Sequence, residues 1–175
     1  MQEFWYKHAD NDTYMIQAYR GDDSEVTVPS SWYGCDVSVL MDDIFKGHTE
    51  ITKVNLPETI TDIGGFVFDG CSSLKSIVLP EKLHTLWQYA FVRSSFEELV
   101  IPKGVNDVVP FCFQDCANLR RIVLTADHVR LMGWSFLRCT ALEEVVLPRD
   151  AAIHENAFAG CEGVKLVYRT DSRNG

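Results

Sequence analysis

The hydrophobic pattern of the chain repeats with a period of 22 or 23 residues. A phenylalanine marks each unit, and we call these six residues the anchors: Phe45, Phe68, Phe91, Phe113, Phe136 and Phe158. An apolar residue precedes each anchor by five positions: Leu40, Ile63, Leu86, Val108, Leu131 and Ile153. Self-similarity at a fixed period of this length is the signature of a solenoid, in which each unit forms one coil. A single coil cannot bury its apolar side alone, so the coils stack on a continuous core.

Each anchor is followed by an apolar triplet with the spacing 0, 3, 5. The triplets are Ile51/Val54/Leu56, Leu74/Ile77/Leu79, Phe96/Leu99/Ile101, Leu119/Ile122/Leu124, Leu142/Val145/Leu147 and Val164/Val167/Arg169, the last of which ends on a charged residue. The last two positions of a triplet lie two residues apart, so they point to the same side of a short strand. Proline follows four of the triplets, and it ends a strand because it has no N–H to donate. The pattern predicts a mainly-β solenoid with a parallel sheet along one, concave, face.

The two ends of the chain depart from the repeat. Aromatic residues, a turn at Asp10-Asn11-Asp12 and the alternation Tyr14/Ile16/Ala18 predict a β-hairpin. Together with a first degenerate coil near Val26, this hairpin forms a predicted N-terminal cap over residues 1–30. The solenoid is predicted over residues 31–169, and residues 170–175 form a C-terminal tail.

One unit, "ITDIGGFVFDGCSSLKSIVLP" at residues 60–80, resembles the repeat of BspA-like leucine-rich-repeat proteins. The resemblance spans about residues 26–168 and recurs in every unit. Trp87, Val109, Met132 and His154 stand where this unit has Gly64. The resemblance implies a leucine-rich-repeat fold and a bacterial protein exposed at the cell surface or secreted, which attaches to host or matrix components.

Composition and charge narrow the classes of partner. The chain has 175 residues, of which 46% are hydrophobic and 23% charged, as in an ordinary globular protein. Its 16 basic residues are outnumbered by 25 acidic ones, which disfavours nucleic acid or an anionic membrane as the main partner. No apolar run reaches the roughly 18–20 residues of a membrane span. The first 20 residues hold no apolar stretch of signal-peptide length, so a cytosolic protein and a preceding targeting segment both stay open.

Four of the six cysteines share one place in the repeat, three residues after an anchor. This column contains Cys71, Cys116, Cys139 and Cys161, with His48 and Ser94 in the same place in other coils. Free cysteine is among the most buried residue types, so the column is predicted to point inward. Disulfides Cys116–Cys139 or Cys139–Cys161 are an alternative, although equivalent positions have near-parallel Cβ vectors. Cys112-x3-Cys116 lacks the two further ligands of a zinc site, and Cys35 is the expected exposed thiol.

Two other clusters are candidates for sites of chemistry. His48 beside Cys71 is the nearest approach to a nucleophile and base, but the repeat places no orienting acid there. Asp10-Asn11-Asp12 is similar to the start of a calcium loop but lacks its glycine and late glutamate. The chain has no phosphate loop and no dinucleotide fingerprint. The prediction is therefore a protein without catalytic, metal or cofactor-binding residues.

Residues between the inward positions of the sheet point outward in two columns. The first column is Asn55, Val78, Val100, Val123, Val146 and Tyr168, and the second is Lys53, Ser76, Glu98, Arg121, Glu144 and Leu166. One interpretation is strand propensity with a salt-bridge ladder Glu98–Arg121–Glu144. The other is an apolar strip with a charged rim, as interaction surfaces are often built.

The second interpretation defines the candidate site, which comprises both columns except Leu166. It predicts a non-enzymatic module that binds a protein or a glycan through the concave face. The alternatives are a structural or spacer array within a larger protein, or a cytosolic interaction protein. The identity of the partner and the oligomeric state are left open.

Overall fold

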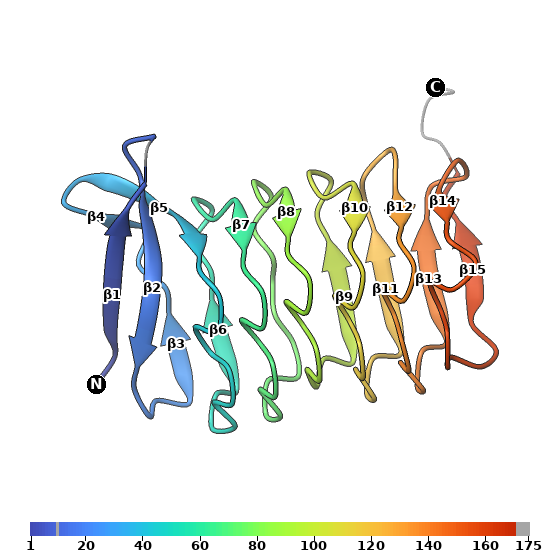
Figure 1. Ribbon diagram of the computed structural model, residues 1–175, viewed down its shortest axis with the longest axis horizontal. Helices are drawn as coiled ribbons and strands as arrows, with labels where there is room; N and C mark the ends of the chain where they lie inside the picture. Colours follow the sequence, from blue (N-terminus) through green and yellow to red (C-terminus); the bar gives the residue numbers. More distant parts are fainter. Residues whose placement is uncertain (10, 171–175) are drawn as a thin grey trace.

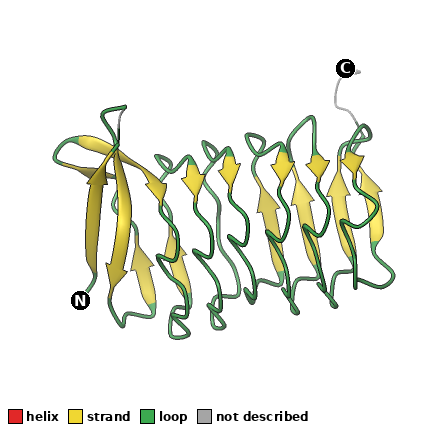
Figure 2. Cartoon of the chain, in the orientation of Figure 1, coloured by secondary structure: helices red, strands yellow, loops and turns green. Residues whose placement is uncertain are grey.

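The computed structural model describes residues 1–9 and 11–170. Within these residues the chain forms fifteen strands and no helix (Figure 2). The strands follow one another along an elongated array, with β1 (Glu3–His8) and β15 (Lys165–Tyr168) at opposite ends (Figure 1). The predicted mainly-β solenoid is confirmed. Asp10 of the predicted turn and residues 171–175 of the predicted tail lie outside the described residues.

The first coil is covered by the hairpin that the sequence predicts. Strand β1 (Glu3–His8) pairs with β2 (Tyr14–Arg20) in antiparallel orientation, and β2 pairs in parallel with β5 (Cys35–Leu40). A short strand, β4 (Ser31–Trp32), pairs with β5 in antiparallel orientation. Hydrogen bonding therefore continues from the hairpin into the solenoid, and β1 forms its N-terminal edge (Figure 1).

We call the predicted sheet the main ladder. It consists of β3 (Glu25–Thr27) paired with β6 (Lys53–Asn55), and of four strands in the order β9 (Glu98–Ile101), β11 (Arg121–Leu124), β13 (Glu144–Leu147) and β15 (Lys165–Tyr168). All of these pairs are parallel. Ile122 lies between Leu99 and Val145, so equivalent positions of the repeat are aligned as the triplets predict.

A second parallel ladder runs along the other flank of each coil, where the sequence pattern predicts no sheet. Its short strands are β7 (Asp62–Ile63), β8 (Thr85–Leu86), β10 (Asp107–Val108), β12 (Arg130–Leu131) and β14 (Ala152–Ile153). Each ends on the apolar residue five positions before an anchor. Ile63 pairs with Leu40 and Leu86, and Leu131 pairs with Val108 and Ile153. Both ladders place alternate side chains toward the space between them.

The anchors fill that space as a stack of rings. Phe91 stacks on Phe68 with ring centroids 5.4 Å apart and on Phe113 at 5.2 Å, and Phe113 stacks on Phe136 at 5.1 Å. Five of the six anchors are fully buried, whereas Phe158 in the last coil is only partly buried. Offset stacking of this kind adds to the hydrophobic stabilisation of each coil-to-coil interface.

Both ladders are interrupted near the middle of the array. In the main ladder, residues 76–79 form no strand and make no backbone hydrogen bond among the described residues. In the second ladder, no backbone hydrogen bond of the described residues joins residues 83–90 to residues 104–111. The two coils are joined in the core instead, where the Phe91 amide donates to the Cys112 carbonyl at 3.0 Å. Each interruption coincides with a hollow in the surface.

Candidate functional site

The predicted outward columns lie on or beside the main ladder. Lys53 and Asn55 belong to β6, Glu98 and Val100 to β9, Arg121 and Val123 to β11, Glu144 and Val146 to β13, and Tyr168 to β15, whereas Ser76 and Val78 lie in the interrupted coil. Side chains between them, such as Leu99 and Ile122, are buried, so the alternation of the strands separates the two sets.

We call the first outward column, which contains Val78, Val100, Val123 and Val146, the valine column. The exposure of its side chains decreases toward the C-terminal end. The residue Val78 is 83% exposed, Val100 is 55% exposed and Val123 is partly buried. Val146 is only 8% exposed, so the structure does not offer it as a contact residue in the way that the column predicts. The exposed apolar strip is therefore short and centred on Val78 and Val100.

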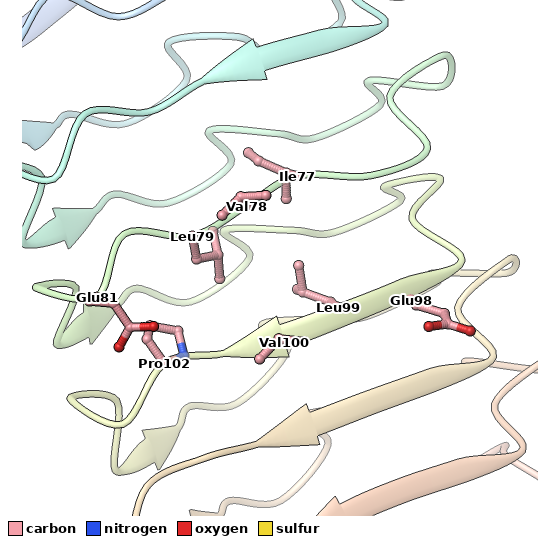
Figure 3. Close-up of a pocket in the computed structure, with 8 residues that line it drawn as sticks. All are labelled: Ile77, Val78, Leu79, Glu81, Glu98, Leu99, Val100 and Pro102. Atoms are coloured by element: carbon pink, nitrogen blue, oxygen red, sulfur yellow. The ribbon is translucent and has the colours of Figure 1, made fainter.

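A hollow of about 230 Å³, which we call the valine hollow, lies between Val78 and Val100 (Figure 3). Neighbouring apolar side chains line it, among them Ile77 and Leu99, and Glu81 and Glu98 stand at its margin. Both margin residues are acidic and exposed. The hollow can accept a small apolar side chain next to a positively charged or hydrogen-bonding group.

The interrupted coil adds backbone groups to this surface. Ser76, Ile77, Val78 and Leu79 make no backbone hydrogen bond among the described residues, whereas the equivalent residues of β9 and β11 pair along their length. Unpaired N–H and C=O groups on an extended segment are a template for another extended chain. The same place therefore offers apolar side chains and free backbone groups.

The predicted salt-bridge ladder is half formed. The Arg121 Nε lies 2.8 Å from Glu144 Oε1, but within the described residues Glu98 makes no ion pair with Arg121, its partner in the strand register. A second pair, Arg120 with Glu143, lies beside the first at 2.9 Å. These pairs are largely solvent-exposed, so each contributes little to stability.

The register of the last coil differs from the predicted one. Val146 pairs with Val167, and Leu147 pairs with Tyr168, so Tyr168 does not continue the valine column. Lys165 follows Cys161 by four positions, whereas Glu144 follows Cys139 by five. This difference shifts the strand by one position.

As a result of this shift, Leu166 rather than Val167 packs on the core. The Arg169 side chain, predicted at an inward triplet position, donates instead to the Ala126 carbonyl.

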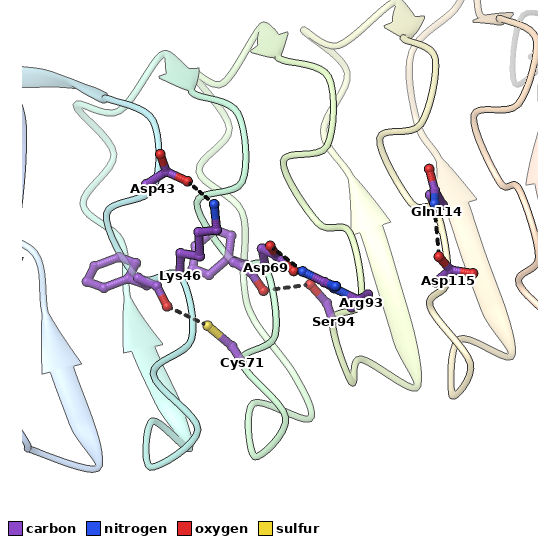
Figure 4. Close-up of polar contacts among 10 residues, drawn as sticks. Asp43, Lys46, Asp69, Cys71, Arg93, Ser94, Gln114 and Asp115 are labelled. Carbon is purple, nitrogen blue, oxygen red and sulfur yellow. Dashed lines mark hydrogen bonds and ion pairs between the residues drawn. The ribbon is translucent and has the colours of Figure 1, made fainter.

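The cysteine column points inward and is hydrogen-bonded. The Cys71 thiol donates to the Phe45 carbonyl at 3.1 Å, and the Ser94 hydroxyl donates to the Phe68 carbonyl at the same distance (Figure 4). All six cysteines are free, so neither of the disulfides considered from the sequence is present. Cys35, the expected exposed thiol, is partly buried, as is Cys161.

His48 and Cys71 do not form a nucleophile–base pair. His48 Nδ1 lies 2.6 Å from Glu50 Oε1, an acid that the repeat pattern does not predict, while the Cys71 thiol is bonded to a carbonyl. Burial raises the pKa of Cys71 to about 12, so the thiol stays protonated at neutral pH. This arrangement suits core packing.

A buried carboxylate lies outside the residues that the sequence singles out. Asp69 is 2% exposed and receives two hydrogen bonds from Arg93, both 2.8 Å long (Figure 4). Asp115 and Arg138 form an equivalent, more exposed pair two coils later. Both pairs span neighbouring coils at the turn after the anchor, and they brace the stack.

The second flank carries a feature that sequence reasoning missed. A groove of about 640 Å³ opens where the second ladder is interrupted, and Phe66, Trp87, Tyr89, Val109 and Met132 are among its lining residues. The signal was present in the sequence, because Trp87, Val109 and Met132 replace a glycine of the repeat. Three successive coils therefore carry a large apolar side chain where the repeat has glycine, and this pattern indicates a surface formed by side chains.

The described residues show neither a metal-ligand cluster nor a membrane-spanning helix. In residues 1–9 and 11–170, no three His, Cys, Asp or Glu side chains are grouped as metal ligands. Within the same residues there is no helix of the length and apolarity that a membrane crossing requires.

Comparison with known proteins agrees with the geometry. A family model described as BspA type leucine rich repeat region matches residues 38–165 in six copies. No curated protein sequence matches the chain. The leucine-rich-repeat protein TpLRR of T. pallidum is similar, with 26% identity, a TM-score of 0.83, and coverage of 95% of this chain and 79% of that chain.

A leucine-rich-repeat protein from Eubacterium ventriosum shares the fold, with 19% identity and a TM-score of 0.63. The match covers 95% of this chain but only 50% of that protein. Because the family model covers most of the sequence with six consecutive repeats, the chain belongs to the BspA-type leucine-rich-repeat family.

Proposed function

We propose that the chain is a non-enzymatic binding module that holds an extended segment of a partner protein across the main ladder. The observation that carries this proposal is the hollow between Val78 and Val100, where exposed apolar side chains lie beside the unpaired backbone of residues 76–79. Solenoids present extended surfaces of this kind to partners. The candidate residues nearest the hollow are Ser76, Val78, Glu98 and Val100.

Binding by strand addition fits both parts of this surface. The partner's main chain would bond to the free N–H and C=O groups, and alternate side chains would contact the valines. Glu81 and Glu98 at the margin favour a basic residue in the partner. The more distant candidates Lys53, Asn55, Arg121, Glu144 and Tyr168 would act as a polar rim. Val123 would add an apolar contact, and Val146 would contribute little because it is buried.

A selection from a phage-displayed library of random 12-residue peptides tests the proposal. Peptides enriched on the immobilised wild-type chain are titrated by calorimetry against Val78→Asp and Val100→Asp. Both residues are exposed, so these variants are expected to fold. Binding that weakens at least tenfold supports the proposal, and Glu162→Lys on the last coil serves as the control for a surface charge change.

Three results would contradict the proposal. Enriched peptides that bind both aspartate variants as tightly as the wild type would place their site elsewhere. A selection that enriches no peptide, together with binding of a glycan to the valine hollow, would replace the protein partner by a glycan. If neither ligand class binds, the module would be better described as a spacer array.

The location of the protein at the cell surface, or outside the cell, belongs to the same proposal. It rests on the resemblance to BspA-like proteins, and the exposed binding face is compatible with it. Mild proteolysis of intact cells provides the test. Loss of the protein from intact cells, while a cytosolic marker protein is retained, supports a surface location, and full protection of the protein contradicts it.

A further inference from the structure

Four aromatic residues on successive coils share one turn position, two residues before the anchor. We call Phe66, Tyr89, Phe111 and Trp134 the aromatic column. Their φ angles are 58°, 63°, 63° and 61°, all in the left-handed region. Such a conformation is unfavourable for an L-residue, and it is unusual for a bulky one. Strain that recurs in one place often marks a functional surface.

Stacking within the aromatic column offsets part of that cost. The ring centroid of Tyr89 lies 4.7 Å from that of Phe66 and 5.2 Å from that of Phe111. The ring centroids of Phe111 and Trp134 are 5.8 Å apart, and all three interplanar angles are 6° or less. The inner rings therefore cover one another's faces and present only their edges to solvent. Stacking explains how the aromatic column holds together, but it does not explain the large residues beside it.

Those neighbouring residues form the other wall of the groove. Trp87, Val109 and Met132 occupy the place of Gly64, and together with Phe66 and Tyr89 of the aromatic column they line the groove of about 640 Å³. Trp87 is 58% exposed. Within the described residues its ring stacks on no other ring and its indole N–H has no hydrogen-bond partner. A large side chain held in this way is available to a ligand.

The charge of the groove indicates what kind of ligand fits. Among the described residues that line it, Asp42 is the one charged residue, and none is a lysine or arginine. The Asp42 Oδ1 accepts a bond from the Gly65 amide at 2.7 Å, and the carboxylate stays exposed. The chain as a whole carries a formal charge of −9. A cationic ligand is therefore favoured over a neutral or anionic one.

The molecule already holds one cation against the aromatic column. The Lys46 ammonium lies 4.7 Å from the centroid of the Phe66 ring, over its free face, and it pairs with Asp43 at 2.9 Å. Cations are attracted to aromatic faces, most strongly to tryptophan. Trp87 and Asp42 offer an incoming cation the same combination of aromatic ring and carboxylate.

We propose that this groove binds an extended segment of a partner protein in which an arginine or lysine is flanked by proline or other apolar residues. The cation sits at Trp87 and Asp42, and the apolar residues lie along Val109, Pro110 and Met132. The groove crosses four coil-to-coil steps of about 4.8 Å each, which is the reach of roughly six extended residues. This site is on the second ladder and is independent of the valine hollow.

The test uses the peptide Ac-Arg-Pro-Leu-Pro-Leu-Arg-NH2, which carries a cation at either end and so suits both chain directions. Prolines keep it extended at low entropic cost. Its control replaces both arginines by citrulline, which keeps the shape and removes the charge. The four tryptophans of the chain supply the readout, as indole N–H signals in a ¹⁵N-labelled protein.

The arginine peptide is expected to shift the indole signals of Trp87 and Trp134 and to leave those of Trp5 and Trp32, at the N-terminal hairpin, unchanged. The citrulline peptide should bind at least about fivefold more weakly than the arginine peptide. Trp87→Ala should abolish the shift of Trp134. Asp42→Asn, which keeps the acceptor for Gly65 and loses the charge, should weaken binding to the level of the citrulline peptide.

Several outcomes would overturn the inference. Equal affinities of the two peptides would show that no cation is recognised. Shifts at Trp5 and Trp32 alone would place the binding at the hairpin. Unmoved indole signals at millimolar arginine peptide would exclude the site, and so would shifts of Trp87 caused by chitotetraose but not by the peptide, because the ligand would then be a glycan.

Discussion

The Cys116 thiol donates a hydrogen bond to the Phe91 carbonyl at 3.0 Å, which joins one coil to the anchor of the coil before it. Cys139 makes the same contact with Phe113 at 2.8 Å, and Ser94 makes it with Phe68. A small donor therefore follows five of the six anchors by three residues, since a buried carbonyl without a partner costs free energy. His48, which follows Phe45, pairs with Glu50 instead. The donor, rather than the sulfur itself, explains the column.

Substitutions of Cys116 should separate the hydrogen bond from the packing. Cys116→Ser keeps a donor of similar size and should lower the free energy of unfolding by less than Cys116→Val, which fills the space but leaves the Phe91 carbonyl unpaired. We expect a difference of about 1 kcal/mol between the two variants. Denaturation in guanidinium chloride measures it, and a valine variant as stable as the serine variant would show that the bond contributes nothing.

Cys71 should react slowly with thiol reagents while the protein is folded. Its side chain is fully buried, and burial raises its pKa to about 12, so at pH 8 almost none of it is the reactive thiolate. Labelling with an aromatic disulfide reagent, followed by mass spectrometry, should find Cys71 modified at least 100-fold more slowly than in the unfolded chain.

Cys35, which is partly buried, serves as the internal comparison. Equal labelling rates of Cys71 and Cys35 in the native protein would contradict the buried column.

The repeat explains which parts of this arrangement could be predicted. Inward residues such as Ile122 recur on every coil with a spacing of two, and this spacing indicates a strand. The second ladder was missed because strands of two residues, such as β7, contain only one inward residue, so no alternation can be seen. The aromatic column was missed because φ angles above zero predict glycine or asparagine, and Phe111 is neither.

The last coil shows a different limit of the sequence pattern. The deleted residue can lie anywhere between Cys161 and the next strand. Leu166 and Val167 are both apolar, so either can be aligned with the inward position of the strand. Only the pairing with Val145 and Val146 decides between them. One residue of slip moves every side chain of the strand to the other face, which is why Tyr168 was misplaced.

The pair Asp69–Arg93 should contribute strongly to stability because one partner is buried. Arg93→Ala leaves the Asp69 carboxylate without its two hydrogen bonds, and we expect a loss of about 2 kcal/mol in the free energy of unfolding. The double variant Asp69→Asn with Arg93→Ala should lose less than Arg93→Ala alone, because no buried charge remains. Thermal unfolding of the four proteins completes the cycle, and additive losses would rule out this coupling.

The pair Asp115–Arg138 should make stability depend on pH in the acid range. The hydrogen bonds from Arg138 hold the pKa of Asp115 below its ordinary value near 4. A carboxylate with a lowered pKa in the folded state adds stability above its unfolded pKa, and this stability is lost as the pH falls through the lower folded value.

The difference in stability between wild type and Arg138→Gln should therefore shrink between pH 5 and pH 2, as measured by urea denaturation. A constant difference over that range would mean that the pair is not formed in solution.

Amide hydrogen exchange should show the interruption of the main ladder directly. The amides of Ile77, Val78 and Leu79 have no hydrogen-bond acceptor in the part of the chain that the structure describes, whereas Ile122 lies on β11 between two paired strands. Exchange at residues 77–79 should be at least 1,000-fold faster than at Ile122. Equal protection would show that the coil pairs with β9 in solution, which would remove the free backbone groups on which strand addition depends. A bound peptide should instead slow exchange at residues 77–79 and leave Ile122 unchanged, because only the unpaired segment gains acceptors.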